Sequence, residues 1–175
     1  MIGYKATYNG KCFNYKLYEV DQTYTLDGQL VICENGFHFC QDLYDVFSYY
    51  ATNKDLKIFK VEALGNIDTE GDKSVTDKIK ILEEVDLSNM VLEKYGSKKY
   101  FNNKGNYIKI ENSDGSWAKR EYDKNNNLIK EETSSGSWEK WKYDENNNCI
   151  KFENSYGFCF VYEYDKYNNL IKNDV

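Results

Sequence analysis

The side chains best suited to nucleophilic chemistry lie together in one short segment. His38 is the single histidine of the 175-residue chain, and it stands two residues before Cys40 in the segment Gly36–Phe37–His38–Phe39–Cys40. Residues two apart on a strand face the same side, so a Cys–His dyad is geometrically possible there. The sequence shows neither an oxyanion hole nor an acid that would orient the imidazole. We therefore expect a structural histidine. An uncharacterised enzyme using His38 is the alternative, which His38→Ala would support by abolishing an activity and leaving the fold intact.

Cysteine and histidine are also the residue types that bind zinc. Cys12, Cys33, His38 and Cys40 have the spacing C-x20-C-x4-H-x-C, which lacks the paired C-x2-C typical of zinc sites. The sequence contains no Gly-rich phosphate loop, no H-E-x-x-H and no G-x-S-x-G. We expect no metal, no cofactor and no catalytic residue. Five cysteines without an export signal predict reduced thiols in a protein of the bacterial host's cytoplasm.

Aromatic side chains beside charges suit binding better than catalysis. Trp117 and Trp138 stand among lysines and glutamates, where exposed tryptophans make good interface anchors. An alternative is that the two residues only cap the end of a hairpin. A double variant, Trp117→Ala with Trp138→Ala, would exclude them as anchors if partner capture were unchanged. The candidate partner-binding residues are Trp117, Trp138, Trp141, Tyr143 and Tyr162.

These aromatic residues belong to a repeat of 21 residues. The recurring columns are Ile108, Ile129, Ile150 and Ile171; Gly115, Gly136 and Gly157; and Phe101, Tyr122, Tyr143 and Tyr164. Each copy has two alternating runs, separated by turns of glycine or asparagine, which tolerate positive φ. The repeat therefore predicts an antiparallel meander of about seven strands over residues 106–172.

Alternation within each strand sorts the side chains of the meander onto two faces. Trp141, Tyr143 and Tyr162 share a face that becomes more aromatic toward the C-terminus, as a packed face does. Trp117 and Trp138 stand with charged residues on the other face. The sequence leaves open which of the two faces is exposed.

Tyr-Asp pairs recur in the same register, at residues 122–123, 143–144 and 164–165, with Leu128 and Leu170 following them. In these residues the repeat resembles the YD, or Rhs-type, repeat. It departs from that pattern where asparagine replaces a turn glycine, at Asn126, Asn147 and Asn168, and where Cys149 replaces a leucine. Dozens of YD copies wrap into a shell around a toxin, which three and a half copies cannot do. The resemblance implies an open sheet whose apolar face lies on the N-terminal part, on a second copy in a dimer, or on a partner.

Residues 1–95 follow a different pattern from residues 96–175. Short alternating runs over 3–8, 57–65 and 78–85 predict strands. Asp42, followed by Leu43, Val46, Phe47 and Tyr50 at helical spacing, predicts a helix over about 42–52. A second short helix is expected from Asp86 to Gly96. We therefore expect an acidic α+β domain over residues 1–95, followed by the repeat sheet over residues 96–175.

Several pieces of the N-terminal part match a known family. They are Gly3–Tyr4–Lys5, Cys12, Tyr24, Cys33, GFHFC at 36–40, Val46–Phe47, Tyr49–Tyr50, Val61, Gly65 and GDKSVT at 71–76. In these pieces the chain is similar to an uncharacterised domain family found in phage and bacterial proteins. GFHFC is the most specific of them. The resemblance implies an origin in a phage or prophage and no assigned activity.

Charge is divided unevenly between the two parts. Residues 1–95 hold 10 Lys and 16 Asp/Glu, a net of −6, and residues 96–175 hold 13 Lys/Arg and 13 Asp/Glu, a net of 0. An acidic part can steer a basic partner, although solubility is the simpler interpretation. A pI near 5.0 argues against direct nucleic-acid binding. No apolar run is long enough for a transmembrane helix, so we expect no membrane partner.

These features together predict a non-catalytic, protein-binding inhibitor of phage or prophage origin. Its specific form would be an anti-CRISPR or other counter-defence factor that occupies a basic nucleic-acid-binding surface of a host nuclease. Binding of that kind weakens as the salt concentration rises. A structural or interaction module of a bacterial surface or toxin system is the alternative that the YD resemblance implies, and secretion would favour it.

Overall fold

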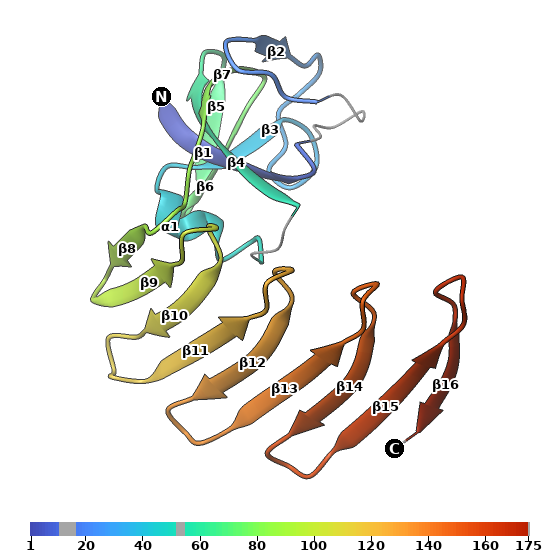
Figure 1. The fold of residues 1–175 in the computed structure, drawn as a ribbon. Helices are drawn as coiled ribbons and strands as arrows, with labels where there is room; N and C mark the ends of the chain where they lie inside the picture. Colours follow the sequence, from blue (N-terminus) through green and yellow to red (C-terminus); the bar gives the residue numbers. More distant parts are fainter. Residues whose placement is uncertain (11–16, 52–54, 175) are drawn as a thin grey trace. The chain divides into compact units, whose positions relative to one another are not determined.

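The structure is a computed structural model that describes residues 1–10, 17–51 and 55–174. The chain divides into two compact units, Met1–Ser88 and Asn89–Val175 (Figure 1). Each unit is described by itself. The domain boundary between residues 95 and 96 stays a prediction. No helix among the described residues is long and apolar enough to cross a membrane.

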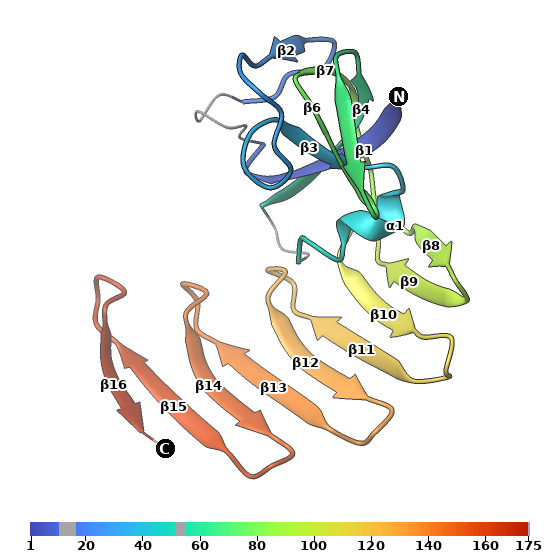
Figure 2. The same ribbon diagram turned by 180° about the vertical axis from the view of Figure 1, so that it is seen from behind.

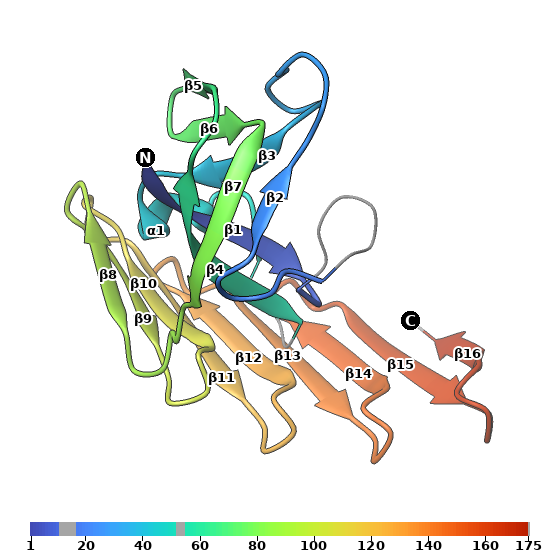
Figure 3. The ribbon, with the colours of Figure 1, turned by 90° about the horizontal axis from the view of Figure 1, so that it is seen from above.

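The first unit is built around a seven-stranded antiparallel sheet. Its strands are β1 (Ile2–Tyr8), β2 (Thr23–Thr25), β3 (Phe37–Cys40), β4 (Leu56–Ala63), β5 (Ile67–Glu70), β6 (Lys73–Thr76) and β7 (Lys78–Glu84). They lie in the order β2-β7-β4-β1-β3-β6-β5, with β2 beside β7 at one end (Figure 3). The strands predicted over 3–8, 57–65 and 78–85 are confirmed as β1, β4 and β7.

One hydrophobic cluster holds this sheet together. Its buried members are Tyr18, Phe37, Phe39, Phe59, Val61, Ala63, Ile79 and Ile81. On β7, Ile79 and Ile81 are both fully buried while the lysines beside them are not, as a strand with one covered face requires. Each fully buried isoleucine contributes about 1.5–3 kcal/mol to folding.

The helix predicted over about 42–52 is wrong in length, and the α+β class with it. The structure has a single turn, α1 (Leu43–Val46). Asp42 does cap it, because its side chain accepts a hydrogen bond from the Tyr44 N–H at 2.8 Å. Beyond the turn, Ser48 and Tyr49 donate to carbonyls three residues back, at 2.9 Å and 3.1 Å, and Tyr50 shares the Val46 carbonyl, so the segment does not continue as a regular α-helix. The aromatic residues of this segment have low helix propensity.

The second predicted helix, from Asp86 to Gly96, is also wrong. The segment forms β8 (Val91–Lys94), which pairs with β9 (Ser97–Phe101). The two residues that connect the strands both have positive φ, 52° at Tyr95 and 75° at Gly96. Two positive φ values in a two-residue loop define the tight hairpin turn whose twist matches paired strands. Gly96 therefore ends a hairpin turn between two strands and not a helix.

The second unit is a nine-stranded antiparallel meander. After β8 and β9 come β10 (Tyr107–Glu111), β11 (Trp117–Tyr122), β12 (Leu128–Thr133), β13 (Trp138–Tyr143), β14 (Cys149–Asn154), β15 (Cys159–Tyr164) and β16 (Leu170–Asp174). Every strand pairs with its neighbours in sequence (Figures 1 and 2). The predicted meander of about seven strands is confirmed as β10 to β16, and β8 and β9 extend it.

The glycines and asparagines that recur in the 21-residue repeat are turn positions. Gly115, Gly136 and Gly157 have φ values of 85°, 85° and 88°, and Asn126, Asn147 and Asn168 have φ values of 74°, 64° and 66°. In the Tyr-Asp pairs, the aspartate accepts backbone N–H bonds within the asparagine turn, at 2.9 Å and 2.9 Å for Asp144. These bonds and the Asn148 amide lower the pKa of Asp144. The repeated residues therefore maintain the hairpins.

Burial differs sharply between the two units. Among the described residues from Tyr107 to Asn173, none is buried, and the aromatic side chains there are half-buried or exposed. Within the second unit the meander is a single layer of strands (Figure 2). An isolated sheet layer of this kind is stabilised by its cross-strand pairs.

Candidate functional site

The strand register divides the repeat sheet into two faces with different chemistry. Glu132 is the cross-strand partner of Trp138, and Lys140 is the partner of Glu153, so all four side chains lie on the same side of the sheet. We call this side the charged face; its residues include Lys109, Glu111, Trp117, Lys119, Lys130, Glu132, Trp138, Lys140, Lys142, Lys151, Glu153, Val161 and Lys172. The side chains that alternate with them form the aromatic face, which consists of Trp141, Tyr143, Phe152, Phe160 and Tyr162. The five predicted partner-binding residues are thus divided between the two faces.

The two tryptophans of the charged face lie against lysines. The Lys119 Nζ is 4.4 Å from the centroid of the Trp117 ring, and the Lys140 Nζ is 4.7 Å from that of Trp138. A hollow of about 460 Å³ lies between the two tryptophans, with Lys130 in its lining. Each tryptophan ring therefore already has a cation of the same molecule beside it.

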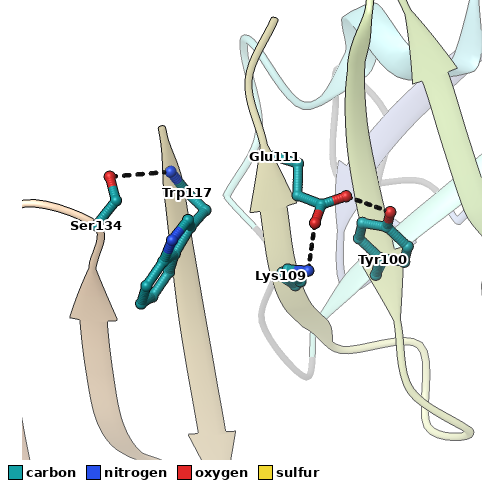
Figure 4. A network of polar contacts seen from close by, with 5 residues as sticks. All are labelled: Tyr100, Lys109, Glu111, Trp117 and Ser134. Atoms are coloured by element: carbon teal, nitrogen blue, oxygen red, sulfur yellow. Dashed lines mark hydrogen bonds and ion pairs between the residues drawn. The ribbon is translucent and has the colours of Figure 1, made fainter. Parts of the chain in front are cut away.

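Backbone bonds show that the tryptophans also connect one hairpin to the next. The Trp117 N–H donates to the Ser134 Oγ at 3.1 Å, and the Ser134 N–H donates back to the Trp117 carbonyl at 2.8 Å (Figure 4). Trp138 and Ser155 repeat the arrangement at 3.2 Å and 2.9 Å. These bonds use backbone groups of the two tryptophans, so the choice between the hairpin-capping and the binding interpretation of their side chains stays a prediction.

Ion pairs join lysines to glutamates on this face. Lys130 contacts Glu132 at 2.7 Å and Lys151 contacts Glu153 at 2.6 Å. The earlier copy pairs Lys109 with Glu111, which also accepts a hydrogen bond from the Tyr100 hydroxyl (Figure 4). The hydrogen bond from Lys130 lowers the pKa of Glu132. Lys130 and Lys151 are thus paired with glutamates, whereas Lys119 and Lys140 lie against the tryptophan rings.

The aromatic face presents a row of rings in contact. Ring centroids are 5.6 Å apart for Trp141 and Phe152, 6.0 Å for Phe152 and Phe160, and 6.5 Å for Phe160 and Tyr162. One repeat earlier, the positions of Trp141 and Phe152 hold Arg120 and Glu131, whose Nε and Oε2 are 2.6 Å apart. The face therefore changes from polar to aromatic along the repeats.

Basic side chains are absent from the aromatic face over the described strands β12 to β16. By alternation, the lysines of these strands all lie on the charged face; they are Lys130, Lys140, Lys142, Lys151 and Lys172. Glu131 and the exposed Glu139 lie on the aromatic face. Glu131 is paired with Arg120 of the neighbouring strand β11, whereas Glu139 is exposed beside the rings. Aromatic rings with an exposed carboxylate attract arginine and lysine from another molecule.

The segment 36–40 lies in the first unit, at β3. Phe37, Phe39 and Cys40 are buried, and His38 is half-buried. The His38 Nε2 accepts a hydrogen bond from the backbone N–H of Cys33 at 2.7 Å. A hydrogen bond at this nitrogen occupies the lone pair that a general base would use.

The charge state of His38 follows from its surroundings. Burial lowers the pKa of His38 below its ordinary value of 6.5, and the ammonium groups of Lys5 and Lys73 lower it further, against a hydrogen bond with Gly36 that raises it. The imidazole is therefore neutral at physiological pH. Together with the bond from Cys33, this describes a histidine that ties a loop to β3, and the choice between a structural and a catalytic His38 stays a prediction.

Sequence reasoning missed two residues that the fold places at His38. The Cys33 Sγ, not that of Cys40, lies on the same network, and it accepts a hydrogen bond from the Lys73 Nζ at 3.3 Å. No local pattern connects Lys73 to this segment, because the pairing of β3 with β6 places it opposite Cys40. Cys12 of the zinc comparison lies outside the described residues. Within the described ranges, no group of three or more His, Cys, Asp or Glu side chains is arranged to hold a metal ion.

Comparison with known proteins identifies the first unit. A family model described as a domain of unknown function, DUF7666, matches residues 1–93. This confirms the resemblance of the N-terminal part to an uncharacterised family; the YD resemblance of the repeats stays a prediction. A search of curated proteins gave no match. Because the family model spans more than half of the 175 residues, the chain belongs to the DUF7666 family.

Proposed function

We propose that this protein is a non-catalytic binding protein that captures a partner with a basic surface on the aromatic face. The supporting observation is the composition of that face: contacting rings and the exposed Glu139, without a lysine or arginine over the described strands β12 to β16. Arginine and lysine side chains of a partner would stack on Trp141 and Tyr162. Half-buried aromatic residues of this kind are the usual anchors of protein interfaces.

The specific form of the proposal is an inhibitor of a host nuclease. A nuclease binds nucleic acid through a groove lined by basic side chains. Residues 1–95 have a net charge of −6 and attract such a groove, and the rings of the aromatic face can stack on its arginines and lysines. Occupying the groove would block nucleic acid without any chemistry. The counter-defence role, of the anti-CRISPR kind, depends on the phage or prophage origin that the family resemblance implies.

Two alternatives differ in what they require. A module of a bacterial surface or toxin system would use the open sheet in a larger assembly, as the YD resemblance implies. An enzyme would have to use His38, whose Nε2 already accepts the Cys33 N–H. The binding proposal needs no such rearrangement and is therefore preferred.

Affinity capture from host lysate with the full chain, followed by binding measurements on the purified partner, tests the proposal. We expect a basic nucleic-acid-binding protein whose affinity falls between 50 and about 300 mM salt, and which nucleic acid displaces. Recovery of no partner, or of one whose binding is independent of salt and of nucleic acid, would contradict the proposal.

A pair of matched double variants tests which face binds. Trp141→Ser with Tyr162→Ser removes two rings from the aromatic face, and Trp138→Ser with Val161→Ser removes two apolar side chains from the charged face. Loss of two anchor rings should weaken binding by roughly a thousandfold, because each anchor contributes about 2 kcal/mol and each ~1.4 kcal/mol is tenfold in affinity. The charged-face variant should bind within a few-fold of wild type. Circular dichroism and thermal melts establish that both variants fold.

A further inference from the structure

The first unit contains a cleft whose lining belongs to that unit alone. Its volume is about 520 Å³, within the range of small-molecule sites, ~300–1,000 Å³. Strands β1 and β3 supply its walls, together with Tyr49 and Tyr50 after α1 and Lys73 at the start of β6. Nothing in the binding proposal for the repeat sheet uses this cleft.

The charge of the cleft is opposite to that of its unit. Among the described residues that line it, the charged side chains are Lys5 and Lys73, and no carboxylate is present. The Lys5 Nζ donates to the His38 carbonyl at 2.8 Å, and the Lys73 Nζ donates to the Cys33 Sγ at 3.3 Å. Since the Cys33 N–H donates to the His38 Nε2 at 2.7 Å, both ammonium groups join one network. Two cations therefore line the cleft, linked to one another through neutral His38 and Cys33.

Aromatic rings form the rest of the wall. The rings of Tyr8 and Tyr50 are tilted, with centroids 5.6 Å apart, and the Tyr49 ring lies 4.3 Å from the Lys73 Nζ. The hydrogen bond from the Tyr49 hydroxyl to Asp72 raises the pKa of Tyr49 to about 12. This phenol therefore stays neutral, and it adds no negative charge to the cleft. Flat rings beside cations suit a ligand that is planar and acidic.

A buried hydroxyl in the lining gives an independent indication of a ligand. Thr7 is 6% exposed and lines the cleft, and its Oγ1 has no hydrogen-bond partner among the described residues. Buried polar groups in native proteins are almost always satisfied, so such an atom calls for an explanation. A polar atom of a bound molecule would supply the missing bond.

We propose that this cleft binds a small planar organic acid, such as an aromatic carboxylate or a nucleoside monophosphate. Its acidic group is held by Lys5 and Lys73, its ring packs against Tyr8 and Tyr50, and a polar atom bonds to the Thr7 Oγ1. Carboxylate and phosphate share this chemistry, because both present anionic oxygens to an ammonium group.

Isothermal titration of the full chain with matched probes tests the proposal. The acids are 4-hydroxybenzoate and AMP, and the uncharged counterparts are 4-hydroxybenzamide and adenosine. We expect at least one acid to bind and its uncharged counterpart to bind at least tenfold more weakly, as loss of a charge-assisted bond predicts. Binding of only one acid identifies which anionic group the cleft accepts. No binding of either acid up to 5 mM, or equal binding of an acid and its counterpart, would overturn the proposal.

Three variants assign the binding to the cleft. Lys73→Ala should weaken the acid by about tenfold or more, whereas Lys78→Ala, on an exposed lysine of β7 outside the lining, should leave it unchanged. Thr7→Val removes the hydroxyl and keeps the shape, so it should weaken binding several-fold and leave the thermal melting temperature the same or higher. Equal affinities for Lys73→Ala and Lys78→Ala would refute the assignment.

Discussion

Replacing Gly36 with alanine tests why the family segment 36–40 begins with glycine. Gly36 has a φ of 133°, and a Cβ there would lie 2.2 Å from the Val75 Cγ2 and 3.0 Å from the Leu30 Cδ2. Val75 is fully buried, so it has little room to move. Backbone strain of this kind costs about 1–3 kcal/mol and overpacking costs another 1–3. We therefore expect the first unit to lose roughly 2–6 kcal/mol of its free energy of unfolding.

Hydrogen exchange in urea, followed by mass spectrometry of peptides from β3 and β6, measures this loss in the full chain. Tryptophan fluorescence gives a separate record of the second unit, because all three tryptophans lie after residue 116. Gly71→Ala is the matched control: Gly71 has a φ of 63°, and a Cβ there would meet nothing within 4 Å. Its cost should be limited to the backbone term of about 1–2 kcal/mol. If Gly36→Ala is no more destabilising than Gly71→Ala, the steric argument is refuted.

Three further predictions concern a hydroxyl, a histidine and a turn. Thr7→Val should leave the free energy of unfolding in urea unchanged or raise it by about 1 kcal/mol, since the deleted Oγ1 has no partner among the described residues; a clear loss would reveal one. The pKa of folded His38 is lowered below 6.5 by burial, Lys5 and Lys73, so its stabilising contribution should be complete above pH 6.5 and should decline as the pH falls through 6.5 toward the folded value. Urea titrations at several pH values would show this decline, and His38→Gln should reduce it; an equal decline in the variant would contradict the assignment. Asn147→Ala should cost the repeat sheet about 2 kcal/mol, because it places alanine at a φ of 64° and deletes an acceptor of two asparagine amides, at 3.1 Å and 2.8 Å. Tryptophan fluorescence in urea measures that cost, Asn147→Gly should recover the backbone part of it, and wild-type stability of the alanine variant would be inconsistent with the turn geometry.

The repeat half was predictable because its structure is local. Strand, turn and strand follow one another within 21 residues, and each turn contains the glycine or asparagine that its positive φ requires. Period-2 alternation then assigns Trp138 and Trp141 to opposite faces without any knowledge of distant residues. The same local rules failed at Tyr95 and Gly96, where a hairpin turn and a helix end have the same sequence signal.

The N-terminal part was less predictable because distant residues decide its structure. Leu43 and Val46 have helical spacing, but only one turn forms, and the hydrophobic cluster joins residues as distant in the sequence as Tyr18 and Ile81. The network at His38 illustrates the same point. It joins Lys5 of β1, Cys33 of a loop and Lys73 of β6, which no spacing rule connects.

The sequence by itself determined the hairpin repeat, the division of its side chains between two faces, and the membership of the GFHFC segment in a family. Only the tertiary structure decided that His38 bonds to Cys33 instead of acting with Cys40, and that two lysines and the Thr7 hydroxyl line one cleft. The physical reason is the range of the interactions. Turn conformation and alternation depend on residues a few positions apart, whereas strand order and the convergence of side chains depend on which segments bury their apolar faces together.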